Sequence, residues 1–172
     1  MVKSGLALAE CRKEACRVID NDQQYMYRQA IRIPLDIEST YQAGAMVSSM
    51  ILFNVALAHH LSALATSEKK HQSKKLRKAT TLYEMAYDLQ GRNAQLENNV
   101  MFTMAAMNNL GVIYQQLENR ETASKCFQCL LSTVMFLVDC GAVKVCCGEI
   151  LDGILRNVTN LASKSSCAAA AA

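Results

Sequence analysis

Apolar residues recur three or four positions apart along most of this chain, and this spacing gives an α-helix one apolar face. The pattern predicts helices over 36–65, 79–90, 94–118, 123–140 and 148–162, and a weaker version of it predicts a surface helix over 4–19. Gly91 and Gly141 follow two of these ranges. Because glycine easily adopts the left-handed conformation that closes a helix, both residues are expected to mark helix ends.

Two segments depart from this spacing. Residues 25–36, "YMYRQAIRIPLD", alternate apolar and polar side chains and contain the only proline of the chain. That alternation predicts an extended segment that packs across the helices or forms a short edge strand. Residues 66–78, "TSEKKHQSKKLRK", lack an apolar face, and we expect a polar, basic loop there that leads into the next helix.

The composition agrees with an all-α domain. Of 172 residues, 51% are hydrophobic, one is proline and none is tryptophan. The length suits one domain with a real core, which we place at 1–164, followed by a low-complexity tail at 165–172. The most apolar window, 43–58, contains Asn54 and two serines and is too short for a membrane span, so it predicts a buried helix.

The chain contains an internal similarity between two pairs of predicted helices. When 54–60 is placed over 109–115, Asn54 falls on Asn109 and His59 falls on Tyr114. The helices that follow also match, since Ala79, Tyr83 and Ala86 fall on Ala123, Phe127 and Leu130. Residues at this spacing share one helix face, and a small residue there lets a partner helix approach closely.

These two units, about 50–90 and 104–137, resemble the tetratricopeptide repeat. The second unit carries the family's pattern as Met107, Leu110, Gly111, Tyr114, Ala123 and Phe127, with Met in place of the usual Trp. The first unit departs from it at Ala56 and His59. The stretches "LFNVALAHHL" and "NNLGVIYQQL" are also similar to the sequences of short tetratricopeptide-like proteins expanded in diatoms. The resemblance implies antiparallel helix hairpins stacked into a short right-handed solenoid, with flanking helices as caps.

The resemblance also implies a function class, because tetratricopeptide modules commonly bind a peptide or a helix in the concave groove of their first helices. The implied groove residues are Phe53, Asn54, Leu57, His60, Asn108, Asn109, Val112 and Gln115, with asparagines as hydrogen-bonding amides. Leu57 and Val112 are expected to form an exposed apolar strip unless the extended segment folds back over it. Members that bind a chaperone's terminal carboxylates use Lys or Arg in this region. Phe53 and Asn108 stand here instead, which argues against that function.

Six basic residues stand within ten positions, namely Lys69, Lys70, Lys74, Lys75, Arg77 and Lys78. They form either a solvated loop or a docking loop for an acidic protein surface, an anionic membrane or RNA. The run has no aromatic side chain on which a base could stack, and the chain's net charge is only +3. Both observations argue against nucleic acid as the partner, and a membrane contact would be peripheral.

Cysteines and histidines raise two chemical alternatives. A zinc site or a redox pair could be built from Cys126 and Cys129, with Cys140, Cys146 and Cys147 downstream. Cys126 and Cys129 lie inside a predicted long helix rather than in a tight turn, and buried thiols behave as small apolar groups. His59 and His60 are adjacent on a helix and therefore point in different directions. We expect no catalytic site, no metal and no cofactor.

The sequence therefore predicts a non-catalytic protein–protein interaction module, an adaptor or scaffold, whose partner is another protein. One alternative is a structural subunit of a larger assembly, attached to a membrane or not, which would suit the Met-rich apolar helices. A second alternative is a small helical enzyme or a metal-binding protein. Eight cysteines without an evident secretory signal predict free thiols in a reducing intracellular compartment, either the cytoplasm or an organelle stroma.

Overall fold

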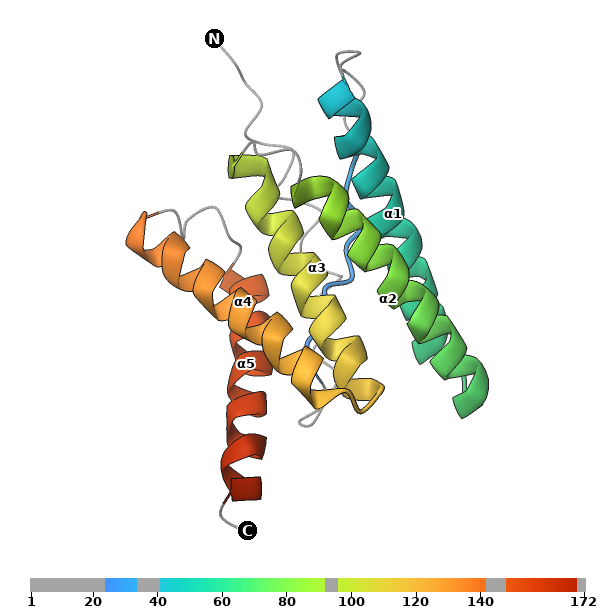
Figure 1. The fold of residues 1–172 in the computed structure, drawn as a ribbon, viewed down its shortest axis with the longest axis vertical. Helices are drawn as coiled ribbons and strands as arrows, with labels where there is room; N and C mark the ends of the chain where they lie inside the picture. The colour runs from blue at the N-terminus through green and yellow to red at the C-terminus, as the bar shows by residue number, and fades with distance from the viewer. Residues whose placement is uncertain (1–23, 34–40, 92–95, 142–147, 170–172) are drawn as a thin grey trace.

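The computed structural model describes residues 24–33, 41–91, 96–141 and 148–169. These residues form α-helices and connecting segments, with no β-strand among them (Figure 1). The helices are α1 (Tyr41–Leu64), α2 (Lys69–Gly91), α3 (Leu96–Gln116), α4 (Arg120–Asp139) and α5 (Gly148–Ala169). The prediction of an all-α chain is confirmed.

The first four helices form two hairpins. α1 packs along α2, and α3 packs along α4. α2 also contacts α3, while α5 lies against α4 and α3 at the C-terminal end (Figure 1). The non-helical segment 24–33, blue in Figure 1, crosses the helices and hydrogen-bonds to α1, α3 and α5. This course matches the prediction of an extended segment that packs across helices.

Two apolar clusters hold the helices together. The first joins α1, α2 and α3 around Phe53, whose ring centroid lies 5.2 Å from that of Tyr83 and 5.4 Å from that of Phe102. The second joins α3, α4 and α5 around Phe127 and Ile154. α3 contributes to both clusters, so it is the helix that couples the two halves of the fold.

Gly111 is required by the close approach of α3 and α4. A Cβ atom added at Gly111 would lie 2.7 Å from Cζ of Phe127, which is closer than packed carbon atoms come. The residues matched between the hairpins also occupy the interior, since Ala79, Tyr83, Ala86, Ala123, Phe127 and Leu130 are all buried. Gly111 of the repeat pattern thus lets α4 approach α3 closely.

The helix ends follow local chemistry. The side chain of Asn119 accepts a hydrogen bond of 3.2 Å from the backbone N–H of Thr122 and caps the start of α4. At the other end of α4, Gly141 has a φ of 66° and terminates the helix as predicted. α2 ends at Gly91, also as predicted.

The start of α2 and the end of α5 differ from the sequence prediction. The basic run was expected to be a loop, but α2 begins at Lys69, so that prediction is wrong. Lysine and arginine are good helix formers, and a helix needs an apolar face only where it is buried. α5 continues to Ala169 into the expected tail. The predicted helix 4–19, the start of the predicted helix at 36–40, and Cys146 and Cys147 lie outside the described residues.

Candidate functional site

Three asparagine side chains from three different helices bind the backbone of the segment 24–33. We call Asn54 of α1, Asn109 of α3 and Asn157 of α5 the asparagine ladder. Each amide oxygen accepts a hydrogen bond from a backbone N–H of the segment, and each amide nitrogen donates one to a backbone carbonyl. The ladder therefore provides the hydrogen bonds that a neighbouring β-strand would provide to an extended chain.

The same geometry is repeated at each asparagine of the ladder, and we call each of the three a rung. Asn157 accepts from Tyr25 N at 2.8 Å and donates to Tyr25 O at 2.6 Å. Asn109 pairs with Tyr27 N and O at 2.9 Å each. Asn54 accepts from Ile31 N at 2.8 Å and donates to Ile31 O at 2.9 Å.

The positions of the three bound residues explain why each amide can satisfy both polar groups of one residue. In an extended chain, the N–H and C=O of a residue point to the same side, and those of the next residue point to the opposite side. Tyr25, Tyr27 and Ile31 are all odd-numbered, so their backbone groups face the helices together. The ladder thus fixes both the direction and the register of the segment.

A buried polar network orients Asn109 and Asn157. Asn108 donates to Tyr25 O at 3.0 Å and accepts from Asn157 at 2.7 Å. Asn109 also donates to the hydroxyl of Tyr83 at 3.0 Å. Burial raises the pKa of Tyr83, so this hydroxyl stays protonated. Because an unpaired amide in such a place would be costly, the network holds the side chains of Asn109 and Asn157 in position.

Side chains of the segment enter specific places beside the ladder. The ring of Tyr25 lies on Gly153 of α5, where any Cβ atom would collide with it. The ring of Tyr27 meets Phe53 edge to face, with centroids 6.1 Å apart. Met26 is 6% exposed and belongs to the first apolar cluster.

The predicted groove residues are brought together, but most of them are not free. Phe53, Leu57, His60, Asn108, Asn109 and Val112 are buried, whereas Asn54 and Gln115 are half-buried. The expectation of an exposed apolar strip at Leu57 and Val112 is wrong, because these side chains are 4% and 2% exposed. The stated exception applies, since the extended segment folds back over the helices.

Sequence reasoning missed Asn157 and Gly153 as contacts of the segment 24–33. A signal for Asn157 was present in the order apolar–x–Asn–apolar. It occurs as Leu52-x-Asn54-Val55, Met107-x-Asn109-Leu110 and Leu155-x-Asn157-Val158. It also occurs as Val158-x-Asn160-Leu161, so the pattern alone does not single out Asn157. α5 was interpreted as a capping helix, although it carries the third rung of the ladder.

His60 lies at the floor of the groove, beside Tyr83. The side chain is fully buried, and neither ring nitrogen has a hydrogen-bond partner among the described residues. Burial, and secondarily the positive charge of Arg28, lower the pKa of His60 to about 4. The imidazole is therefore neutral at physiological pH and packs against the Tyr83 ring with centroids 6.3 Å apart.

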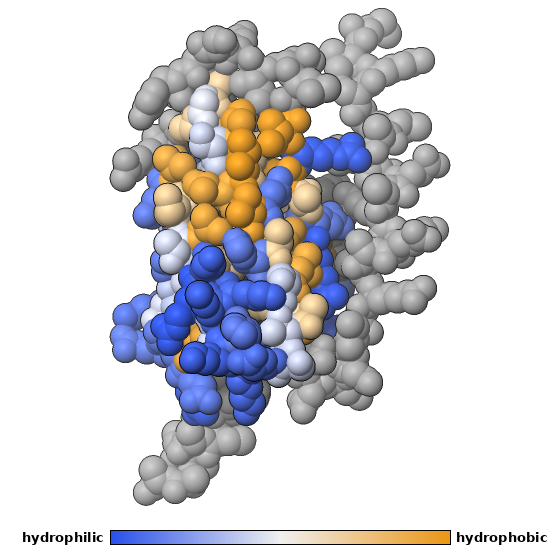
Figure 2. Space-filling view, turned by 90° about the vertical axis from the view of Figure 1, so that its right-hand side faces the viewer, coloured by the Kyte–Doolittle hydropathy of each residue, from blue (hydrophilic) through white to orange (hydrophobic). Residues whose placement is uncertain are grey.

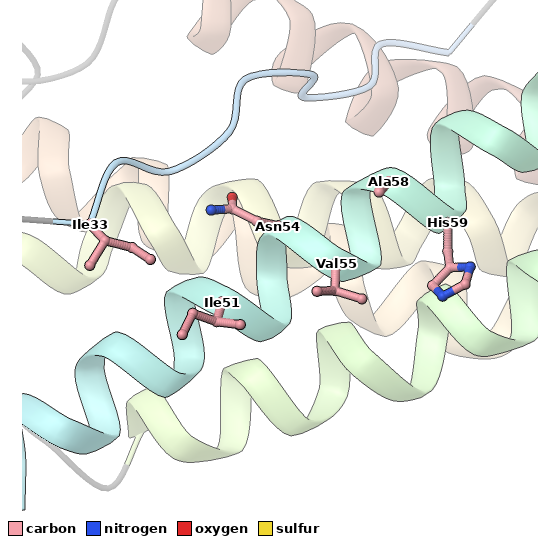
Figure 3. Close-up of a pocket in the computed structure, with 6 residues that line it drawn as sticks. All are labelled: Ile33, Ile51, Asn54, Val55, Ala58 and His59. Carbon is pink, nitrogen blue, oxygen red and sulfur yellow. The ribbon is translucent and has the colours of Figure 1, made fainter.

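An apolar hollow of about 520 Å³ opens where the segment leaves the ladder. It is lined by Ile33, Ile51, Asn54, Val55, Ala58 and His59 (Figure 3). Ile51 and Val55 are 46% and 43% exposed, so one side of α1 presents apolar side chains to solvent. Figure 2 shows apolar surface gathered above a hydrophilic area on this side of the molecule.

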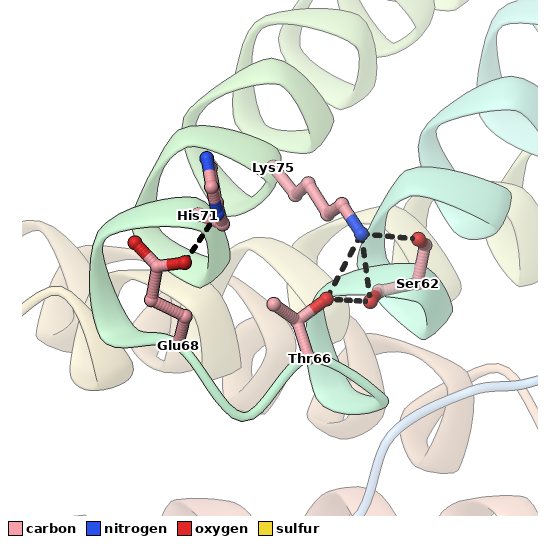
Figure 4. A network of polar contacts seen from close by, with 5 residues as sticks. All are labelled: Ser62, Thr66, Glu68, His71 and Lys75. Atoms are coloured by element: carbon pink, nitrogen blue, oxygen red, sulfur yellow. Dashed lines mark hydrogen bonds and ion pairs between the residues drawn. The ribbon is translucent and has the colours of Figure 1, made fainter.

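The basic run forms the first half of α2. Lys75 donates to the hydroxyls of Ser62 and Thr66, each at 2.9 Å, and so ties α2 to the end of α1 (Figure 4). The other five basic residues of the run are exposed. Lys69 and Lys70 occupy the first turn of α2, where the helix dipole disfavours positive charge. Among the described residues, none of the six basic residues forms an ion pair.

The thiols that the structure describes are free and differ in environment. Cys126 is buried, Cys129 is half-buried and Cys140 is exposed. Burial raises the pKa of Cys126 to about 11. Within the described part of the chain, no three His, Cys, Asp or Glu side chains are grouped as metal ligands.

α1 contains the one described stretch, Ala43–Leu64, that is long and apolar enough to cross a membrane. One third of its most apolar window is buried inside the fold, and its Asn54 is a rung of the ladder. The predicted buried helix is thus partly buried, with an apolar side facing out.

Comparisons with known proteins give no relative for this arrangement. The chain matches no protein-family model, and no curated protein or solved structure is significantly similar to it.

Proposed function

We propose that this protein is a non-catalytic interaction module that binds an extended peptide segment of another protein along the asparagine ladder. The observation that carries the proposal is the pairing of each ladder amide with both backbone groups of one residue. Backbone pairing supplies affinity for an extended chain, and neighbouring side-chain sites supply selectivity. Helices are rigid supports, so the three amides are held ready for such a chain.

The proposed architecture is a short right-handed solenoid similar to tetratricopeptide repeats. The hairpins α1–α2 and α3–α4 would be two units, and α5 would supply the first helix of a third. Support comes from the equivalent asparagines on α1, α3 and α5 and from the matched buried residues of α2 and α4. The free thiols are consistent with the reducing intracellular location that we propose.

Capture of partners by the full chain from its native source tests the proposal. The variant Asn54→Leu removes the ladder's half-buried rung, and Gln128→Leu makes the same change on the exposed face of α4. We expect quantitative mass spectrometry to show partners lost with Asn54→Leu and kept with Gln128→Leu, while circular dichroism stays helical for both. Partners retained equally by both variants would place recognition outside the ladder.

A structural subunit of a larger complex is the second candidate, and exposed apolar side chains on α4 favour it. Met135, Phe136 and Val138 are 59%, 50% and 56% exposed. Apolar side chains gathered on a surface mark interaction sites in soluble proteins. This candidate predicts one stoichiometric complex in native extracts and its loss with Met135→Lys and Phe136→Lys, whereas the ladder variant would leave that complex intact.

A further inference from the structure

The segment 24–33 is held in the manner of a ligand. Six hydrogen bonds join it to the ladder: segment N–H groups donate three of them to the amide oxygens, and the amide nitrogens donate three to segment carbonyls. Such bonds make no demand on the sequence of the extended chain, because every non-proline residue offers the same N–H and C=O. Another extended chain could therefore form the same bonds.

Selectivity comes from the side-chain sites between the rungs. The sites for Tyr25 on Gly153 and for Tyr27 on Phe53 accept aromatic rings, and Met26 fills a buried apolar site. Asn54 holds the backbone of Ile31, a partly buried aliphatic residue. Arg28, Ala30 and Arg32 are exposed, so the matching positions of another bound chain can carry any side chain.

The helices keep most of their core without the segment. Met26 is the only buried residue within 24–33, whereas the aromatic and aliphatic centres of both apolar clusters come from the helices. The polar network of Asn108, Asn109, Asn157 and Tyr83 is likewise built on helices. Loss of the segment would therefore uncover a groove whose walls persist.

We propose that the segment 24–33 is an internal ligand that occupies the groove, and that the partner peptide displaces it. The partner is an extended chain with an aromatic residue, a large apolar residue, a second aromatic residue and, four positions later, an aliphatic residue. It binds in the same direction as the segment, because the rungs on α5, α3 and α1 fix that direction. This inference rests on the proposed function, and it adds the chemistry of the partner and a built-in competitor.

The covalent connection makes the competitor effective. Ile33 precedes Tyr41, the first residue of α1, by eight positions, so the segment stays near the groove after it detaches. A short tether gives an effective concentration in the mM range, against which a partner in solution must compete. A partner can bind only while the groove is open. The affinity of the intact chain is therefore the affinity of the open groove multiplied by the fraction of time that the groove is open.

A labelled peptide with the sequence of residues 24–33, QYMYRQAIRI, is the direct probe. The full chain is compared with its Tyr25→Ser/Tyr27→Ser variant, which weakens the internal segment and leaves every rung intact. If the internal segment occupies the groove at least nine-tenths of the time, the variant binds the peptide at least about tenfold more tightly than the unmodified chain, measured by fluorescence anisotropy. A control peptide in which both tyrosines are serine binds neither protein.

Two results would overturn the inference. One is a folded Tyr25→Ser/Tyr27→Ser variant that binds the peptide no better than the unmodified chain. The other is a dimer in light scattering whose exchanged segments occupy each other's grooves, because the competitor would then be a second copy. If native partners still depend on Asn54 in either case, the proposed function survives and only the internal competition fails.

Hydrogen exchange of the unmodified chain supplies a measurement that does not depend on the variant folding. The backbone N–H of Tyr27 is bonded to Asn109, and that of Leu110 lies within α3. A displaceable segment predicts that the Tyr27 amide exchanges at least about tenfold faster than the Leu110 amide, through local release. Equal exchange rates would mean that the segment leaves only on global unfolding, and the inference would be wrong.

Discussion

The side-chain amide of Asn109 forms hydrogen bonds of 2.9 Å with both the N–H and the C=O of Tyr27. The two residues are far apart in sequence, and the pair lies where the segment 24–33 crosses α3. Asn109 is fully buried, so solvent does not replace these bonds when they are lost. This relationship predicts which asparagine matters most for stability.

Asn109→Ala should lower the free energy of unfolding by roughly 2–4 kcal/mol, because Tyr27 and the Tyr83 hydroxyl would lose their partner in a buried place. Asn54→Ala is the matched control, since it removes the same two bonds from Ile31 at a half-buried rung. We expect a loss of only about 1 kcal/mol there. Urea denaturation followed by circular dichroism measures both, and equal losses would mean that burial does not distinguish the rungs.

Gly111→Leu should destabilise the protein by roughly 1–3 kcal/mol, because Phe127 already occupies the space beside Gly111. Gly44→Ala is the control. Gly44 lies in α1, and an added Cβ there meets no atom of the described residues within 4 Å. Alanine stabilises an open helical position by about 0.5–1 kcal/mol. Thermal melting should therefore shift down for Gly111→Leu and up for Gly44→Ala, and an unchanged melt for Gly111→Leu would show that α3 and α4 can separate at little cost.

The sequence predicted the helices well where burial and helical periodicity act together. The ranges around Tyr83, Gly111 and Phe127 repeat every three or four residues, and each of these residues is buried in the structure. The extended segment was also recognisable, because period-two alternation and the proline exclude a helix. These features are local, so sequence spacing is sufficient to detect them.

The arrangement of the groove could not be predicted in the same way. Whether Leu57 is exposed depends on the extended segment, and its contacts join residues more than a hundred positions apart, as in Tyr25 with Asn157. Sequence spacing carries no information on such contacts without alignment of homologues. The prediction of a loop at the basic run was wrong for a different reason. Lysines favour a helix but do not mark a buried face. The spacing of apolar residues therefore does not distinguish a solvated helix, such as the start of α2, from a loop.

Lys69→Glu with Lys70→Glu should stabilise the fold slightly, by about 0.3–1 kcal/mol per residue, because negative charge suits the first turn of α2. If the basic run docks on an acidic partner, the same change should slow association and reduce its dependence on salt. Arg120→Glu is the control, since it reverses an exposed charge in the first turn of α4. Stopped-flow mixing at several salt concentrations measures this, and unchanged rates for the lysine variant would exclude the run from docking.

Cys126 should react with thiol reagents far more slowly than Cys140 at pH 8. With a pKa of about 11, only about one Cys126 in a thousand is a thiolate at that pH, and the side chain is buried as well. Cys140 is exposed at the end of α4. Peptide mapping after a timed reaction with iodoacetamide gives both rates in the same sample. Fast labelling of Cys126 in folded protein would mean that α4 opens readily.

Acid should destabilise the fold through His60. The pKa of its imidazole is about 4 in the folded protein because of burial, and secondarily because of the positive charge of Arg28, and it returns to about 6.5 when the chain unfolds. The folded state therefore binds a proton less readily than the unfolded state. The stability that depends on neutral His60 is complete above pH 6.5 and is lost as the pH falls from 6.5 to 4, by about 3 kcal/mol in total.

His60→Phe separates this effect from that of other titrating groups, because phenylalanine fills the site beside Tyr83 and cannot take up a proton. The substitution also removes two buried ring nitrogens that have no partner among the described residues, so stability at pH 7 should be unchanged or slightly higher. Urea unfolding between pH 7 and pH 4 should show a smaller loss of stability in His60→Phe than in the unmodified protein. Parallel pH curves for the two proteins would mean that His60 becomes protonated as easily in the fold as in the unfolded chain.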